Sequence, residues 1–184
     1  MKALITSLFF AASAFSQTPW MSAVTPGNSR NDGPYAAGMK LTTGSVPISL
    51  TGLGRFCFAG NSAIHTVYLV SLSGAVLVSA PVHMAGCVPG SFAYGPATFT
   101  LAPNTSYYLL SAEPGGGDAW GDNTDLFTTT AAAVVSTNAY TTTIPPTQGI
   151  NAGGTHYSYG PVSFQYTGGP AAAPAGSPGF PVVY

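Results

Sequence analysis

Short runs of β-branched and aromatic residues, separated by turn residues, follow one another along most of the chain. Val, Thr, Tyr, Phe and Gly dominate these runs. Turn residues recur roughly every 8–12 positions, which is the spacing typical of an all-β protein. The pattern predicts strands at residues 38–43, 53–59, 64–71, 75–79, 91–94, 97–101, 106–112, 126–130 and 161–166.

Two of these predicted strands are largely apolar at both odd and even positions, namely residues 64–71 and 106–112. Strands that are apolar on both faces are covered on both faces, as in the inner part of a layered β-protein. We therefore expect an all-β fold, a single antiparallel β-sandwich of jelly-roll type over residues 17–167, with residues 64–71 as a central strand. Residues 131–133 are expected to form a short helical turn, and residues 141–154 a long loop.

The two ends of the chain differ from this domain. Residues 1–16 match a secretory signal peptide, because Lys2 precedes a short apolar stretch at 3–12 and a small-x-small site at 14–16. No later stretch reaches the roughly 18 apolar residues of a membrane span. We expect a secreted protein, extracellular or at the cell surface, with an uncleaved N-terminal anchor as the alternative. Residues 168–184 form a Pro/Gly/Ala-rich tail.

Charge is scarce in this sequence. Only 5% of the residues are charged, whereas 46% are hydrophobic. Arg30, Lys40 and Arg55 are isolated from one another, and phosphate backbones are bound by clustered basic residues. Nucleic acid is therefore not an expected partner. Because little charge repulsion keeps copies of such a chain apart, its composition also favours self-association.

Cys57 and Cys87 are the two cysteines of the chain. An even number of cysteines in an exported protein favours a disulfide, which here closes a loop of about 30 residues. The alternatives are two buried free thiols or half of a metal site, although a single pair lacks the four-ligand pattern of structural zinc.

Four segments resemble one family. They are an Arg-Asn-Asp motif before Gly-Met-Lys at 28–41, a core hairpin at 53–70, an acidic loop at 107–120 and a closing strand at 159–166. In these segments the chain resembles exported bacterial β-sandwich domains of unknown function, similar to the DUF4082-type jelly rolls. The resemblance covers roughly residues 18–166 and implies a sandwich module of the kind found in large secreted proteins. It implies little about the ligand.

Four of the five acidic residues lie within the glycine-rich window 113–125. Ca²⁺ takes about six to eight oxygen ligands, which clustered carboxylates and loop carbonyls supply. Asp32 joins the window if the loop that carries it meets the acidic loop at one end of the sandwich. The candidate metal ligands are Asp32, Glu113, Asp118, Asp122 and Asp125, and the candidate cofactor is a structural calcium ion. The alternative is a solvated acidic loop.

The same window contains a tryptophan, which suggests a sugar site. Sugar C–H faces stack on indole rings, and carboxylates and amides accept and donate paired hydrogen bonds. Trp120, Asp118 and Asn123 are therefore the candidate ligand-binding residues. The alternative is that Trp120 fills the end of the core. Glycoside hydrolysis needs two carboxyl groups at a defined separation, which the flexible spacing of Glu113 and Asp118 does not provide.

The remaining polar residues carry no catalytic motif. His65 lies within a predicted strand and is expected to be a hydrogen-bonded core histidine rather than a metal ligand. A buried arginine in a nearly uncharged protein needs a carboxylate partner, so Arg30 and Arg55 are expected to pair with Asp32 or Glu113.

These observations favour a noncatalytic extracellular binding module for polysaccharide or cell-surface glycan. The alternative is a structural subunit of a self-associating surface layer, matrix or filament, whose partners are copies of itself.

Overall fold

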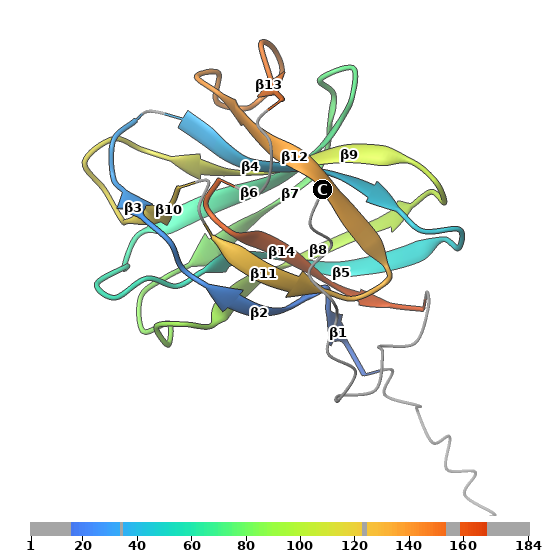
Figure 1. Cartoon of the computed structure of the whole chain (residues 1–184), viewed down its shortest axis with the longest axis horizontal. Helices are drawn as coiled ribbons and strands as arrows, with labels where there is room; N and C mark the ends of the chain where they lie inside the picture. The colour runs from blue at the N-terminus through green and yellow to red at the C-terminus, as the bar shows by residue number, and fades with distance from the viewer. Residues whose placement is uncertain (1–15, 34, 123–124, 154–158, 169–184) are drawn as a thin grey trace, which may run out of the picture.

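The computed structural model describes residues 16–33, 35–122, 125–153 and 159–168, which fold as antiparallel β-strands (Figure 1). Most of the predicted signal peptide and most of the predicted tail lie outside the described residues. The larger sheet has six strands in the order β13 (Asn151–Ala152), β12 (Ala133–Thr141), β4 (Tyr35–Thr43), β9 (Ser106–Glu113), β6 (Ile64–Ser71) and β7 (Val76–His83). The smaller sheet has four, in the order β1 (Thr18–Pro19), β14 (Val162–Thr167), β5 (Ile48–Phe56) and β8 (Phe92–Leu101).

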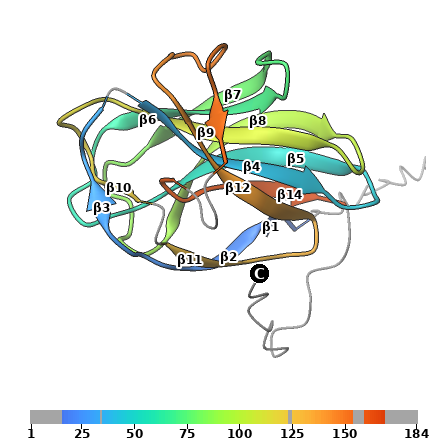
Figure 2. The ribbon, with the colours of Figure 1, turned by 45° about the horizontal axis from the view of Figure 1, so that its top comes forward.

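Two short ribbons complete the described fold. β2 (Met21–Thr25) pairs with β11 (Leu126–Thr129), and β3 (Ser29–Arg30) pairs with β10 (Trp120–Gly121). The β3–β10 ribbon lies at the left end of the molecule in both views, and the β2–β11 ribbon lies along the bottom (Figures 1 and 2). The all-β class and the antiparallel sheets are confirmed, whereas the jelly-roll arrangement stays a prediction.

The two sheets enclose one apolar core. Met39, Leu69 and Leu109 reach it from the six-stranded sheet, while Leu53 and Phe164 reach it from the four-stranded sheet. Burial of apolar surface is the main favourable term in folding, so the contact between the sheets is what holds these layers together.

Trp20 packs within the same core. Its ring stacks on Phe164 with centroids 4.8 Å apart, and its indole N–H donates to the carbonyl oxygen of Ala133 at 2.9 Å.

The chain crosses repeatedly between the two sheets, although β6 and β7 are neighbours within the larger sheet. β5 pairs with β8 in one sheet, while β6 pairs with β9 in the other. Both predicted two-sided strands have neighbours on each side, since β6 lies between β9 and β7, and β9 between β4 and β6. The central position expected for residues 64–71 is confirmed.

Two local predictions are wrong. The strands expected at 91–94 and 97–101 are one continuous strand, β8. Gly95 lies within β8, where this strand approaches β7. A Cβ at Gly95 would lie 2.1 Å from the carbonyl oxygen of Pro81, so only glycine permits the approach.

The helical turn expected at 131–133 does not extend to its last residue: residues 131–132 form a turn, but β12 starts at Ala133 and pairs with β4. Val134 and Val135 follow at once and favour the sheet over the local helix propensity of alanine.

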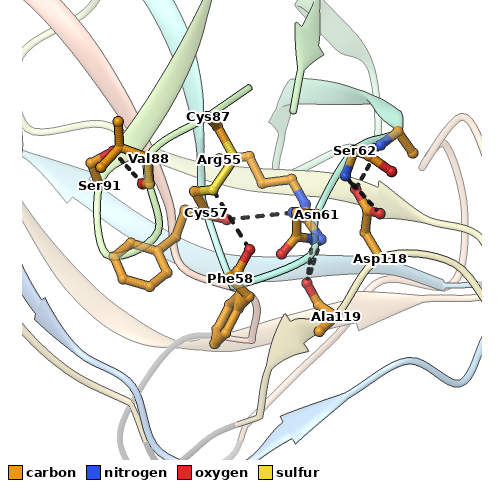
Figure 3. Close-up of a disulfide and its surroundings, with 12 residues drawn as sticks. Arg55, Cys57, Phe58, Asn61, Ser62, Cys87, Val88, Ser91, Asp118 and Ala119 are labelled. Carbon is orange, nitrogen blue, oxygen red and sulfur yellow. Dashed lines mark hydrogen bonds between the residues drawn. A yellow bond between two sulfur atoms is a disulfide. The ribbon is translucent and has the colours of Figure 1, made fainter. Parts of the chain in front are cut away.

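The predicted disulfide is present. Cys57 follows β5 and Cys87 follows β7, and their Cα atoms are 6.1 Å apart. The bridge closes a loop of sequence separation 30, which on the loop-entropy model stabilises the fold by about 3–4 kcal/mol. It lies at the end of β5 where the polar contacts described below begin (Figure 3).

Candidate functional site

The N-terminal motif meets the glycine-rich loop at one end of the sandwich, as expected. Arg30 of β3 is the register partner of Trp120 of β10. The amide of Gly116 donates to the carbonyl oxygen of Asn31 at 2.7 Å. A Cβ at Gly33 would lie only 2.7 Å from the Glu113 carbonyl oxygen. Glycine is therefore required where the two loops touch.

A pocket of about 190 Å³ opens at this end, lined by Arg30, Tyr35, Trp120, Tyr140 and Tyr159. Small-molecule sites are usually larger, about 300–1,000 Å³, so this pocket suits a single ring or substituent rather than a long ligand. Tyr35 begins β4 and Tyr140 is near the end of β12, while Tyr159 precedes β14.

The four aromatic side chains form a closed circuit, which we call the aromatic box (Tyr35, Trp120, Tyr140 and Tyr159). Neighbouring rings have centroids 6.2 Å apart for Tyr35–Trp120, 6.2 Å for Trp120–Tyr159, 5.7 Å for Tyr159–Tyr140 and 6.4 Å for Tyr140–Tyr35. Each pair is steeply inclined, with interplanar angles of 66–87°. Edge-to-face contacts of this kind stabilise aromatic clusters.

Arg30 covers one side of the box. Its guanidinium carbon lies 4.9 Å from the Trp120 ring centroid and 5.8 Å from that of Tyr35, both cation–π distances. The guanidinium also donates to both carboxylate oxygens of Asp32, and it approaches Asp122 at 3.8 Å. This hydrogen bonding holds the pKa of Asp32 below its ordinary value. The predicted pairing of Arg30 with Asp32 is confirmed.

Trp120 is buried, not exposed as a flat stacking platform would be. Only 3% of its surface is accessible, and its indole N–H donates to the Asp32 carbonyl oxygen at 3.3 Å. The ring therefore fills the end of the core and forms one wall of the pocket at the same time. The core-filling alternative is confirmed, whereas the role of Trp120 as a sugar ligand stays a prediction.

Behind the pocket, a chain of buried ionic contacts connects the two sheets. Arg55 of β5 donates from Nε and Nη2 to the two carboxylate oxygens of Glu113 on β9, each at 2.8 Å. The imidazole of His65 on β6 lies 3.1 Å from Glu113 through Nδ1 and 3.1 Å from Asp118 through Nε2. Arg55, His65 and Glu113 are all buried. Two cations thus alternate with two carboxylates.

The surroundings of His65 favour its charged form. Nδ1 faces the Ala112 carbonyl oxygen at 2.8 Å and Nε2 faces a carboxylate, so both nitrogens meet acceptors. Burial lowers the pKa of His65, but the hydrogen bond and charge of Glu113 outweigh it and raise that pKa above 6.5. Burial raises the pKa of Glu113, yet hydrogen bonds from His65 and Arg55 bring it below its ordinary value. The expected core role of His65 is confirmed.

Asp118 ties the glycine-rich loop to the loop between β5 and β6. Its carboxylate accepts from the amides of Ser62 and Ala63 at 2.9–3.0 Å. Arg55 and Asn61 both donate to the carbonyl oxygen of Ala119, each at 2.9 Å (Figure 3). Burial raises the pKa of Asp118, but the two amides and His65 outweigh it and hold the pKa low. Asp118 thus holds the shape of the loop and is not among the residues that line the pocket, so its role as a sugar ligand stays a prediction.

Asp125 is buried beside the same ribbon. One carboxylate oxygen accepts from the Gly27 amide at 2.8 Å, and the other has no hydrogen-bond donor within the described part of the chain. Burial raises the pKa of Asp125 to about 6, against the effect of the Gly27 hydrogen bond.

The five predicted calcium ligands do not converge on one point. Asp32 binds Arg30, Glu113 binds Arg55 and His65, Asp118 binds backbone amides, and Asp125 is buried against Gly27. Across the described residues, no group of three or more His, Cys, Asp or Glu side chains is placed to hold a metal ion. Carboxylates that are close in sequence have different partners in the fold. A structural calcium ion stays a prediction that this geometry does not support, and Asn123 lies outside the described residues.

No family model, curated protein or solved structure matches this chain. The resemblance to the exported bacterial domains therefore stays a prediction. The described part of the chain contains no helix of the length and apolarity needed to cross a membrane.

Three walls of the pocket carry no signal in the sequence. Tyr35, Tyr140 and Tyr159 are more than 100 residues apart at the extremes and lie on separate elements. No local motif connects them, so only the pairing of β4 with β12 and the approach of the β14 segment bring them together.

We expect Arg55→Met to lower the free energy of unfolding by about 3–5 kcal/mol in urea denaturation, because it leaves Glu113 buried without its main partner. Arg30→Met is the matched control at an exposed ion pair, where solvent screening keeps the loss much smaller. If the two substitutions lower the free energy of unfolding equally, the buried ionic contacts are no more important for stability than the exposed pair.

The raised pKa of His65 makes a prediction about pH. A histidine whose pKa is raised in the folded state stabilises the protein fully below the unfolded pKa, and this stabilisation is lost as pH rises through the folded pKa. The stability difference between the native protein and His65→Gln should therefore shrink as pH rises from about 6.5 into the alkaline range. Urea denaturation of both proteins at each pH measures it, and the subtraction cancels groups common to both, such as Asp125. A difference that stays constant over this interval would show that His65 is neutral in the fold.

Proposed function

We propose that this protein is a noncatalytic extracellular binding module that recognises a polysaccharide or cell-surface glycan at the aromatic box. The observation that carries the proposal is the pocket of about 190 Å³ enclosed by four aromatic rings and one guanidinium. Apolar concave sites with a few convergent polar groups are the usual places for small ligands.

The pocket offers the two kinds of contact that a sugar unit uses. The rings provide apolar walls for C–H groups, and tyrosine hydroxyls exchange hydrogen bonds with ligand hydroxyls. Tyr140 is 39% exposed and Arg30 is partly exposed, so the box is reached from solvent on their side.

No reaction is assigned to Glu113 or Asp118. Glu113 is held on both oxygens by Arg55 and His65, and Asp118 is held by backbone amides. A general acid in glycoside hydrolysis needs a raised pKa, whereas the pKa values of both groups are lowered by these partners.

The first test is a glycan array probed with the full chain, followed by titration calorimetry with the best ligand. We expect Tyr140→Ala to weaken binding by roughly tenfold, since stacking on one aromatic ring contributes about 1–1.5 kcal/mol. Tyr108→Ala is the matched control, because Tyr108 is also partly buried and belongs to the same sheet but packs with Ala36 and Leu110 instead of the box. Equal affinities of the two variants for every bound glycan would remove the box as the binding site.

The alternative, a self-associating structural subunit, is favoured by one observation. Several large apolar side chains are exposed on separate elements, namely Ile64, Leu72, Val88, Leu126 and Val134, in a chain with few charges to keep copies apart.

Light scattering coupled to size-exclusion chromatography separates the two functions. The binding module is expected to stay monomeric as protein concentration rises. If the protein assembles as its concentration rises and Val134→Lys abolishes the assembly, the structural subunit replaces the binding module as the proposed function. The reason is that a charge placed in an apolar contact opposes association.

A further inference from the structure

The shape of the aromatic box and the charges at its rim favour one chemical group. We propose that the box binds an ammonium group, carried as a substituent of the recognised glycan. The inference rests on the proposed function for the location of the site, and it adds the part of the ligand that enters the pocket.

The geometry of the rings suits a compact cation better than a flat sugar face. Neighbouring rings are inclined at 66–87°, so they resemble the walls of a box more than a platform. Neighbouring centroids lie 5.7–6.4 Å apart around the circuit, and cation–π attraction acts within about 6 Å of a ring centroid. A cation held in the pocket that these rings line is therefore within reach of more than one ring.

Two features argue against a whole pyranose ring lying in the box. Trp120 is almost fully buried, so it offers no broad exposed face for stacking. The pocket volume of about 190 Å³ is also below that of ordinary small-molecule sites. A substituent that projects from the sugar fits both observations, while the sugar itself stays at the mouth beside Tyr140.

Two carboxylates are set against the guanidinium that lines the pocket. Among the described residues, Arg30 pairs with Asp32 and lies 3.8 Å from Asp122, so negative charge is in excess in this group of side chains. This charge attracts a cation and offsets part of the desolvation that the cation undergoes on entry.

Arg30 shows that the ring faces already accept a cation. Its guanidinium lies over Trp120 and near Tyr35, so a ligand ammonium competes with Arg30 for these two rings. Removal of this internal cation has opposite consequences for two ligand classes. A cationic ligand gains affinity because a repulsive charge is gone, whereas a neutral sugar loses hydrogen-bond donors.

The test is titration calorimetry of the full chain with choline and with its uncharged carbon isostere, which has the same shape but no charge. We expect choline to bind and the isostere to bind at least tenfold more weakly. Tyr140→Ala should weaken choline binding roughly 3- to 30-fold, the effect of losing one cation–π wall. Tyr108→Ala should leave binding unchanged, and Arg30→Gln should strengthen it. A thermal melt of each variant verifies that the fold is retained.

The outcomes separate this inference from the proposed function. Equal binding of choline and its isostere, or no binding of choline while a neutral glycan binds in a Tyr140-dependent way, overturns the ammonium site and leaves the glycan module. Choline binding that depends on Tyr140, without any glycan retained on the array, upholds the ammonium site and removes the glycan function.

Discussion

The buried chain of Arg55, Glu113, His65 and Asp118 is the interaction on which this end of the molecule depends. Arg55 belongs to the four-stranded sheet, whereas Glu113 and His65 belong to the six-stranded sheet, so the contacts join the two layers where the apolar core ends. Buried charges contribute little net stability when all are paired, but the loss of one partner is costly. The chain therefore acts mainly by specifying one arrangement of strands β5, β6 and β9 and of the glycine-rich loop.

The pocket is built directly against this chain. Gly160 lies between them: a Cβ at this position would be 3.5 Å from the Trp120 Cβ and 4.0 Å from a Glu113 carboxylate oxygen. Its φ of 48° is in the region that favours glycine. Arg55 and Asn61 fix Ala119, the residue before Trp120. The walls are consequently held before any ligand arrives, which reduces the ordering cost of binding.

Sequence reasoning succeeded where a chemical need has few possible answers. A buried Arg55 needs a carboxylate partner, and the chain has few carboxylates to choose from. Strands with two apolar faces are covered on both faces and therefore lie between other strands. It failed where tertiary contacts decide. β1, β3, β10 and β13 are two-residue strands with no periodicity to detect, and β12 is preceded by an alanine run that locally favours helix. The acidic window suggested one metal site, yet its members serve different partners.

The distribution of charge is the strongest argument that function resides at this end. Of the charged side chains in the described residues, only Lys40 lies away from the end formed by β3, β10 and the glycine-rich loop; the others are Arg30, Asp32, Arg55, Glu113, Asp118, Asp122 and Asp125. Folding alone does not require this concentration, because an apolar core and a hydroxyl-rich surface sustain the rest of the sandwich without it. Arg55, Glu113 and Asp118 hold the glycine-rich loop, whereas Arg30, which pairs with Asp32 and approaches Asp122, lines the pocket. Since exposed charges are screened by salt and buried ones much less, ionic strength should affect recognition at the rim while leaving the buried chain intact.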